Sequence, residues 1–462
     1  MRKIPRFKIF LLLALSATLL QCADRPQVSV KNEMNVLLIT IDTLRADHLG
    51  CYGYTQHVSP SIDALAHRGV LFSNCISQCP MTPTSHASIL TGQDPYRHGV
   101  REFLSKRLKR DTPTLATLLK NAGYQTAAFV SAYSLEKQKY GLDNGFDVYD
   151  QSFCEEQDAE HFDQEKQRVN SQRQQNPVQR RADLTASLAV DWLRRIDKRP
   201  FFLWVHYFDP HETVLVPPII PGLFEYSVKG PLTPVHLQMY DVEIRFVDLI
   251  LNTLTSELFK MGLGQNTLIV LTSDHGQGLD NHNYEYHTRA LYQEQIHIPL
   301  ILAGKPIPVG VKVDALARST DILPTVLDIL GYPDDKIPLN FDGRSLRTFW
   351  ENTGREKPAE VTAYSETLYS KLRSGGSPMY SMIDGDMKLI YHAEAQYKNE
   401  MYDLARDPLE MNNIFTQQPK HAKKLIGEIN SLLKGTTIST QRAKAGQDKD
   451  WENKLKSLGY MN

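Results

Sequence analysis

The chain has 462 residues and a formal net charge of −1, from 52 Lys and Arg residues against 53 Asp and Glu residues. Hydrophobic residues make up 41% of it and charged residues 23%, which is typical of an ordered globular protein. The balanced charge argues against nucleic-acid binding, because that function needs a basic excess or patch. The length predicts two domains, or one large domain with an appendage.

The N-terminus has the pattern of an export signal. Four basic residues precede the apolar run 9–20, which at about 12 residues is too short to cross a bilayer as a helix. Cys22 follows shortly after this run, an arrangement that resembles a bacterial lipoprotein signal, although Gln21 departs from the small residue usual there. We expect a signal peptide over residues 1–22 and a membrane-anchored lipoprotein, periplasmic or on the cell surface, acylated at Cys22. Plain secretion is the alternative.

The next segments alternate between apolar strands and amphipathic helices. Residues 23–34 are polar and predict a tether. Strands are predicted at 35–41, 126–130, 201–208, 266–273 and 298–304, and helices at 114–123, 181–196, 236–259 and 320–333. Continuous apolar strands between helices predict an α/β fold, with a mostly parallel sheet sandwiched by helices over residues 35–345. Short alternating strands and a charged helix predict a smaller C-terminal α+β domain over residues 346–462.

Two loops and the cysteines leave alternatives open. The polar stretch 154–179 predicts a solvated excursion, or alternatively a lid over the site. The Pro-rich stretch 213–234 predicts an apolar wall for the substrate, or only a stiffened loop. The even number of cysteines beyond Cys22 is compatible with disulfides outside the cytoplasm, but spacing alone gives no pairing for Cys51, Cys75, Cys79 and Cys154.

Residues that commonly bind metal ions follow three of the predicted strands: Asp42, Asp209, His211, Asp274 and His275, with His282 and His287 in the loop after the last strand. A single Asp after a strand often caps the following helix, so the prediction depends on three strands showing the same feature. The carboxyl ends of parallel strands form the usual ligand site of an open α/β sheet. Mixed carboxylate and imidazole ligands favour zinc or manganese over calcium.

Thr82 is the candidate nucleophile. It precedes Pro83 and a helix-compatible stretch, which is typical of an N-cap hydroxyl followed by Pro at the first helical position. The positive end of the helix dipole would favour an anionic ester beside it. The segment alone is equally compatible with Thr82 only capping the helix. Coordination to a metal would separate the two interpretations, since it makes a hydroxyl nucleophilic at neutral pH.

Several segments, in the same order along the chain, resemble the sulfatase family within the alkaline phosphatase superfamily: 35–54, 84–92, 271–282, 291–302, 321–331, 385–392 and 401–415. Sulfatases carry Cys or Ser, converted to formylglycine, at the nucleophile position, and Arg just before an Ala-Ser pair. Counting back from Ala87 puts the nucleophile at Thr82 and the Arg position at His86. Threonine cannot form the aldehyde, so the resemblance points to the Thr-nucleophile, two-metal branch of the superfamily.

The resemblance implies two metal sites. The first would use Asp42, Thr82, Asp274 and His275, and the second would use His211 and His287, with Asp209 as a third ligand; a mononuclear site is the alternative. His282 matches a sulfatase histidine and would be a catalytic residue, or alternatively lies behind the ligands. His86 would orient the nucleophile or the anion, or alternatively faces solvent. His206 is expected to pack within its strand.

The resulting hypothesis is a metal-dependent hydrolase or phosphotransferase. Thr82 would attack the phosphorus or sulfur of a small-molecule, glycan-linked or lipid-linked anionic ester, with one or two divalent ions as cofactors. Either the second metal or the histidines His211 and His287 would stabilise the leaving oxygen. One alternative is a sulfuric ester hydrolase that works without formylglycine. Another is a non-catalytic surface lipoprotein that serves as a binding module.

Overall fold

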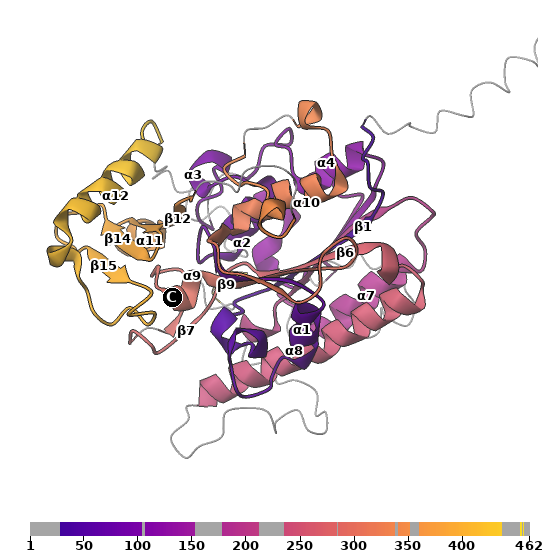
Figure 1. Ribbon diagram of the computed structural model, residues 1–462, viewed down its shortest axis with the longest axis horizontal. Coiled ribbons are helices and arrows are strands. Elements are labelled where there is room, and N and C mark those ends of the chain that lie inside the picture. Colours follow the sequence, from indigo (N-terminus) through magenta and orange to yellow (C-terminus); the bar gives the residue numbers. More distant parts are fainter. Residues whose placement is uncertain are drawn as a thin grey trace, which may run out of the picture.

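The computed structural model describes residues 28–103, 107–152, 178–211, 235–283, 285–337, 341–351 and 360–436, together with residues 453, 454 and 456. A large β-sheet with helices on both faces and a small antiparallel sheet near the C-terminus organise this part of the chain (Figure 1). The predicted signal peptide, Cys22, the loop 213–234 and nearly all of the stretch 154–179 lie outside the described residues.

The large sheet has the strand order β10-β2-β9-β6-β1-β5-β3-β4, with β11 paired to β2. Its strands run parallel, except that β9 is antiparallel to both β2 and β6. The strands are β1 (Asn35–Ile41), β2 (Gly69–Ile76), β3 (Gln125–Phe129), β4 (Val148–Asp150), β5 (Phe201–Tyr207), β6 (Thr267–Ser273), β9 (His297–Ala303), β10 (Val311–Val313) and β11 (Ala317–Arg318). This order places β1 at the centre, between β5 and β6.

Helices cover both faces of the sheet, with α2, α4 and α10 on one face and α1, α7 and α8 on the other (Figure 1). The helices of this part are α1 (Pro60–His67), α2 (Thr82–Thr91), α3 (Pro95–His98), α4 (Leu115–Asn121), α5 (Lys137–Tyr140), α7 (Ala182–Leu193), α8 (Val235–Lys260), α9 (Gln293–Ile296) and α10 (Ile322–Leu330).

The apolar run of β1 explains why the sheet has two buried faces. Every residue of β1 is buried. Val36 and Leu38 pack with the core on the α2 face, whereas Leu37, Ile39 and Ile41 pack with the core on the α8 face. Successive side chains of a strand point to opposite faces, so a strand that is buried on both faces must be apolar throughout. Each fully buried side chain of this kind contributes about 1.5–3 kcal/mol.

The predicted fold class is confirmed, with element boundaries that mostly agree within a few residues. Several features were not predicted, among them strand β2, helix α1 and the antiparallel direction of β9. The chain between β6 and β9 contains only the short helix α9 and the two-stranded ribbon of β7 (Gly278–Leu279) and β8 (Glu285–Tyr286). Without a crossover helix, the chain returns beside β6 in the opposite direction, as adjacent antiparallel strands do.

The small sheet has the order β12-β13-β14-β15, all antiparallel: β12 (Ala363–Thr367), β13 (Met379–Asp384), β14 (Met387–His392) and β15 (Glu400–Asp403). Helix α12 (Pro419–Leu432) packs on it through Leu425 and Ile429, and α11 (Tyr369–Ser374) follows β12. Glu366 of β12 forms a buried ion pair with Arg101, which follows α3 in the larger part of the chain. The domain boundary at residue 346 stays a prediction.

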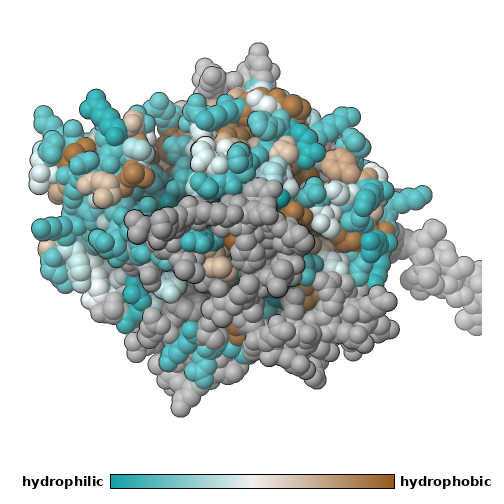
Figure 2. Space-filling view, turned by 90° about the horizontal axis from the view of Figure 1, so that it is seen from below, coloured by the Kyte–Doolittle hydropathy of each residue, from teal (hydrophilic) through white to brown (hydrophobic). Residues whose placement is uncertain are grey.

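Three of the cysteines are described, and Cys51, Cys75 and Cys79 are all free thiols, so none of them is bonded to another. Cys154 lies outside the described residues. None of the helices in the described ranges is both long and apolar enough to cross a membrane. The coloured surface in Figure 2 is mostly hydrophilic, with hydrophobic residues in small groups between the hydrophilic ones.

Candidate active site

The carboxyl ends of β1 and β6 bring together three potential metal ligands. Asp42 follows β1 directly, Asp274 and His275 follow β6, and one ligand atom from each lies within 4.8 Å of the others. All three side chains are fully buried. The two strands are parallel neighbours with Ile41 opposite Ser273, so the residues that follow them leave the sheet side by side.

Hydrogen bonds to Asp274 fix the main chain around this cluster. Asp274 Oδ1 accepts from the N–H of His275 at 2.8 Å and from the N–H of Thr43 at 3.2 Å. Thr43 has a φ of 55°, in the left-handed region that favours glycine. Such a conformation costs a non-glycine residue on the order of 1–3 kcal/mol and is concentrated at functional sites. The bond to Asp274 holds the strained residue directly behind the cluster.

Thr82 reaches this cluster from the start of α2. Its Oγ1 lies 3.3 Å from Nε2 of His275. The other ring nitrogen of His275 lies 3.0 Å from the carbonyl oxygen of Gly276, which can only accept, so Nδ1 carries the ring proton. Nε2 therefore presents a lone pair to the Thr82 hydroxyl or to a cation. Thr82 is the first residue of the helix and Met81 takes the N-cap position, one residue earlier than the sequence predicted.

His86 lies behind Thr82 and is fully buried, so of the two alternatives the solvent-facing ring is wrong. Its Nδ1 donates to the main-chain oxygen of Thr82 at 2.8 Å, and its Nε2 lies 3.0 Å from Oγ1 of Thr40. The indole N–H of Trp204 donates to the same hydroxyl at 2.9 Å, so the hydroxyl can donate to His86. Burial lowers the pKa of His86 to about 3, more than the nearby Asp274 raises it, so the ring is neutral.

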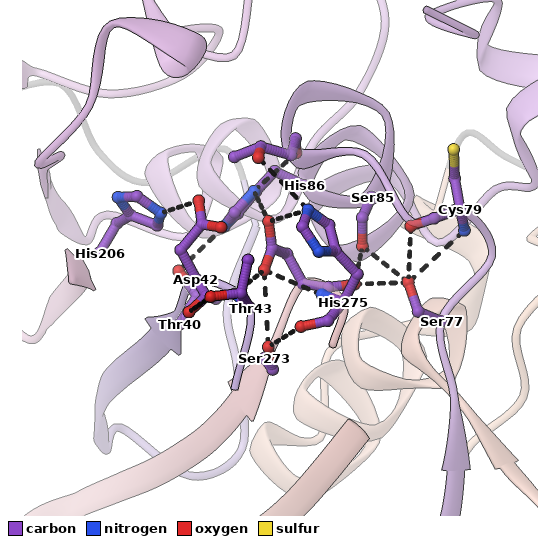
Figure 3. Close-up of polar contacts among 12 residues, drawn as sticks. Thr40, Asp42, Thr43, Ser77, Cys79, Ser85, His86, His206, Ser273 and His275 are labelled. Carbon is purple, nitrogen blue, oxygen red and sulfur yellow. Dashed lines mark hydrogen bonds and ion pairs between the residues drawn. The ribbon is translucent and has the colours of Figure 1, made fainter. Parts of the chain in front are cut away.

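His206 contacts the metal-ligand cluster, a role that the sequence did not indicate. Its Nδ1 accepts from the N–H of Ser131 at 3.3 Å, which leaves the proton on Nε2, 3.2 Å from Oδ2 of Asp42 (Figure 3). Burial lowers the pKa of His206 to about 3. The contact follows from the pairing of β5 with β1, where His206 lies opposite Thr40, two residues before Asp42. A neutral His206 therefore donates to Asp42 and orients its carboxylate.

His211 and His287 extend the site with two more imidazoles. The ring centroid of His287 lies 4.5 Å from that of His275 and 4.8 Å from that of His211. His287 Nδ1 donates to Oε1 of Gln277 at 2.9 Å, and the ring of His211 stacks on Phe208. Burial is the main cause that lowers the pKa of His211 to about 3 and the pKa of His287 well below its usual value. Both rings are therefore neutral and able to bind a cation or a proton.

Asp209 lies at the beginning of α7. Its Oδ1 accepts from the N–H of Ala182, the first residue of that helix, at 3.1 Å, and lies 3.6 Å from Nη2 of Arg181. Burial raises the pKa of Asp209 to about 6, while the Arg181 charge lowers it. Asp209 is not among the three residues that form the metal-ligand group in the described chain. Its predicted part in a second metal site stays a prediction.

His282 is in the loop that joins β7 to β8 and contacts Glu294 and Glu410. Its Nδ1 is 2.8 Å from Oε1 of Glu294, its Nε2 is 3.3 Å from the carbonyl oxygen of Glu410, and its ring stacks on Tyr292. The interaction with Glu294 raises the pKa of His282, although burial is the largest single influence and acts in the opposite direction. Through these contacts His282 joins the β7–β8 ribbon to Glu294 and Glu410. Its catalytic role stays a prediction.

The three-residue cluster has the donor set of a divalent-cation site. Asp42 Oδ1 and Asp274 Oδ2 are buried and accept no hydrogen bond from a residue that the structure describes. Burial, followed by repulsion from Asp274, raises the pKa of Asp42 well above its usual value. Two adjacent buried carboxylates are costly unless a cation neutralises them. With Nε2 of His275, these oxygens fit a cation that binds both oxygen and nitrogen.

The comparisons with known proteins identify the class of protein. The sulfatase family model matches residues 34–332, and the model of the C-terminal region of N-sulphoglucosamine sulphohydrolase matches residues 281–437. The chain therefore belongs to the sulfatase family. The N-acetylglucosamine-6-O-sulfatase of Bacteroides thetaiotaomicron is 26% identical to it, over 92% of this chain and 90% of the relative. An ulvan-active sulfatase of Formosa agariphila is 25% identical, over 87% of this chain and 82% of the relative.

Solved structures show the same fold. The phosphonate monoester hydrolase of Agrobacterium radiobacter superposes with a TM-score of 0.69 at 21% identity, covering 87% of this chain and 95% of its own. A sulfatase structure from Bacteroides thetaiotaomicron gives a TM-score of 0.68 at 22% identity, covering 89% and 93%. At this identity the likeness concerns the fold, and the chemistry has to be argued from the residues of the site.

Proposed function

We propose that this sulfatase-family protein hydrolyses sulfate esters of a sugar or glycan, with the hydroxyl of Thr82 as nucleophile. One observation carries the proposal, namely that Thr82 Oγ1 lies 3.3 Å from His275 Nε2, next to the buried carboxylates of Asp42 and Asp274. The names of two relatives support the substrate class, since one acts on N-acetylglucosamine 6-O-sulfate and the other is active on ulvan.

Asp42, Asp274 and His275 would hold a divalent cation, for which the mixed donors favour zinc or manganese over calcium. When bound, the cation supplies positive charge that lowers the pKa of a nearby hydroxyl and balances charge on the ester oxygens. His206 orients Asp42, and His86 holds the first turn of α2 through the main-chain oxygen of Thr82. The protein's own residues thus fix both the donors and the nucleophile before substrate binds.

The reaction proceeds as an in-line displacement at sulfur. As a bond forms from Thr82 Oγ1 to sulfur, the hydroxyl proton passes to the neutral imidazole of His211 or His287, which donates it to the sugar oxygen as the bond from sulfur to that oxygen breaks. Threonine has no route to an aldehyde, so the Thr82 sulfate ester cannot be released by elimination. Water must attack this ester in a second displacement, which frees sulfate and restores the hydroxyl.

Phosphate or phosphonate esters are the second candidate substrates. The specific observation in their favour is the threonine itself together with the neighbouring imidazoles of His211, His275 and His287, which give a second metal ion nitrogen donors. A second cation beside the first would balance the extra charge of a phosphoryl group. The likeness to the phosphonate monoester hydrolase concerns the fold alone.

We also propose that the protein is exported and anchored in a membrane through a lipid on Cys22. The support is the basic start, the short apolar run and the position of the cysteine. Mass spectrometry of the N-terminal peptide would show an acylated Cys22, whereas an unmodified N-terminus after the signal would indicate plain secretion.

The hydrolase proposal is tested with the purified protein, its metal content and a substrate panel. We expect one or two equivalents of a divalent metal, and aryl sulfate cleaved faster than aryl phosphate monoesters and diesters. Thr82→Ala should lose activity at least about 10²-fold. Thr84→Ala is the matched control, since Thr84 is buried in the same helix and is expected to keep activity. A Thr82→Ala protein as fast as the parent, or an active protein without metal, would contradict the proposal.

A further inference from the structure

A cavity of about 460 Å³ lies where β6 begins and β9 ends. We call this side of the large sheet its amino-terminal edge; Asp42 and Asp274 lie at the opposite ends of the strands. Its walls are largely apolar: Leu65, Phe259, Ile269, Ala303, Ile307 and Val309. Ile269 and Ala303 are paired across β6 and β9 near the amino-terminal end of β6. Asp274 follows five residues later, so the cavity lies about 16 Å along the strand from the catalytic cluster. The cavity therefore forms no part of the catalytic site described above.

Two side chains at this cavity expose apolar surface. Val309 is 73% exposed and Phe259 is 43% exposed, and most large apolar side chains of the described residues are buried. Cavities of this volume are the usual size of a small-ligand site. An apolar ligand would cover both side chains.

Arg68 and Lys305 also line the cavity, and both are exposed. Neither forms an ion pair with any residue of the described ranges. An apolar cavity with two cations beside it fits a molecule that has a hydrocarbon body and an anionic end. A phospholipid with an anionic headgroup has this chemistry, and Lys and Arg near a membrane surface each contribute about 1 kcal/mol to binding.

The N-terminal part of the chain reaches the same edge. The side-chain amide of Asn266 donates to the main-chain oxygen of Glu33 at 2.9 Å, and Gly264, two residues before Asn266, lines the cavity. The first described residue, Val28, donates to the main-chain oxygen of Asn121 at 3.1 Å, and Cys22 precedes it by six residues, which span at most about 20 Å when extended. A bilayer that holds an acylated Cys22 would therefore lie within reach of this edge.

We propose that this cavity binds an acyl chain of an anionic membrane lipid and docks the amino-terminal edge of the sheet on the bilayer. The catalytic cluster at the opposite edge then faces away from the membrane, toward extracellular or periplasmic substrates. This inference goes beyond the hydrolase proposal and does not depend on Thr82 as nucleophile.

The test uses the chain from residue 23, which keeps every described residue and lacks both the signal and Cys22. Co-sedimentation with phosphatidylglycerol vesicles should exceed that with phosphatidylcholine vesicles. Val309→Asp and Lys305→Glu should each weaken phosphatidylglycerol binding about tenfold. Leu409→Asp is the matched control, because Leu409 is 62% exposed and lies after the small sheet, and its binding should equal the parent's.

Thermal melting and ester hydrolysis, measured on all variants, separate docking from folding and from catalysis. We expect both to equal those of the parent in Val309→Asp, Lys305→Glu and Leu409→Asp, and we expect Thr82→Ala to lose hydrolysis but keep full vesicle binding. The proposal is overturned if the chain from residue 23 does not bind phosphatidylglycerol vesicles. That result would leave the covalent anchor as the sole membrane contact. Equal weakening by Leu409→Asp and Val309→Asp would overturn it as well, because binding would then not involve the cavity.

Discussion

The Nδ1 atom of His86 donates a hydrogen bond of 2.8 Å to the main-chain oxygen of Thr82, one helical turn earlier on α2. This carbonyl belongs to the proposed nucleophile, so the bond fixes the backbone from which the hydroxyl projects. Thr40 and Trp204 hold the other side of the ring, which joins the helix to β1 and β5. We therefore expect His86 to act as a positioning residue, since the contacts that fix it are to the backbone of Thr82 and to the strands.

His86→Ala should lower kcat about 10²-fold with little change in KM, because a small displacement of the nucleophile affects the transition state more than binding. His86→Asn places an amide N–H near the former Nδ1 and should recover most of the rate. Steady-state kinetics with an aryl sulfate measure both. Equal losses in the two variants would show that the hydrogen bond to Thr82 is not the reason for the effect.

Asp42→Asn should lower the bound metal and the activity together. The variant keeps the volume and the hydrogen bond with His206 but removes one of the two negative charges that would hold the cation, and metal affinity should fall more than tenfold. Elemental analysis after dialysis against a limiting metal concentration gives the affinity. Asp241→Asn is the control, since Asp241 is fully buried but contacts His48 and Tyr54. Equal metal loss in both variants would argue against a site at Asp42.

Much of the large sheet could be predicted from the sequence because apolar runs have clear ends. The run 35–41 is followed by Asp42, and the observed strand β1 has those same bounds. Strand β2 is harder to recognise, since Gly69 begins it and Ser73 and Asn74 interrupt its apolar residues. The direction of β9 depends on a connection without a crossover helix, which the apolar pattern of residues 298–304 does not show.

The site could be predicted only as a set of residue types at strand ends. Asp42, Asp274 and His275 lie together because β1 and β6 are neighbours, and the order of strands is a tertiary property. Local sequence could not show that His206 would meet Asp42 through the register of β5, nor that Asp209 would cap α7. Both contacts join segments far apart in the chain.

His287→Ala should slow poor leaving groups more than good ones. We assign to this neutral imidazole the transfer of the Thr82 proton to the departing oxygen, and general acid–base assistance is worth about 10²–10⁴-fold where the leaving group is basic. The loss in kcat/KM should therefore be large for an alkyl or sugar sulfate and small for nitrophenyl sulfate. His297→Ala is a matched control, because His297 is a largely buried histidine that contacts the main-chain oxygen of Ser73. A loss that is the same for all leaving groups would contradict the assignment.

Asp94 gives the fold a pH dependence that can be separated from catalysis. It is buried beside Asp342, whose side-chain Oδ2 accepts from the main-chain N–H of Asp94 at 2.9 Å. Burial and then the Asp342 charge raise the pKa of Asp94 to about 7, although Arg318 acts in the opposite direction. In the unfolded chain the carboxyl would have its ordinary pKa of 3.8. The folded state therefore binds the proton more tightly, and ionisation of Asp94 opposes folding.

The contribution of Asp94 to the free energy of unfolding is fully present below pH 4 and is lost as the pH rises through about 7. Asp94→Asn, which cannot ionise, should match the parent at pH 4 and be more stable at pH 8 by on the order of 2–4 kcal/mol. Urea denaturation across this range measures the difference. Asp335→Asn, an exposed control, should show no such trend. A constant difference between Asp94→Asn and the parent at all pH values would mean that Asp94 is already ionised in the folded protein at pH 4.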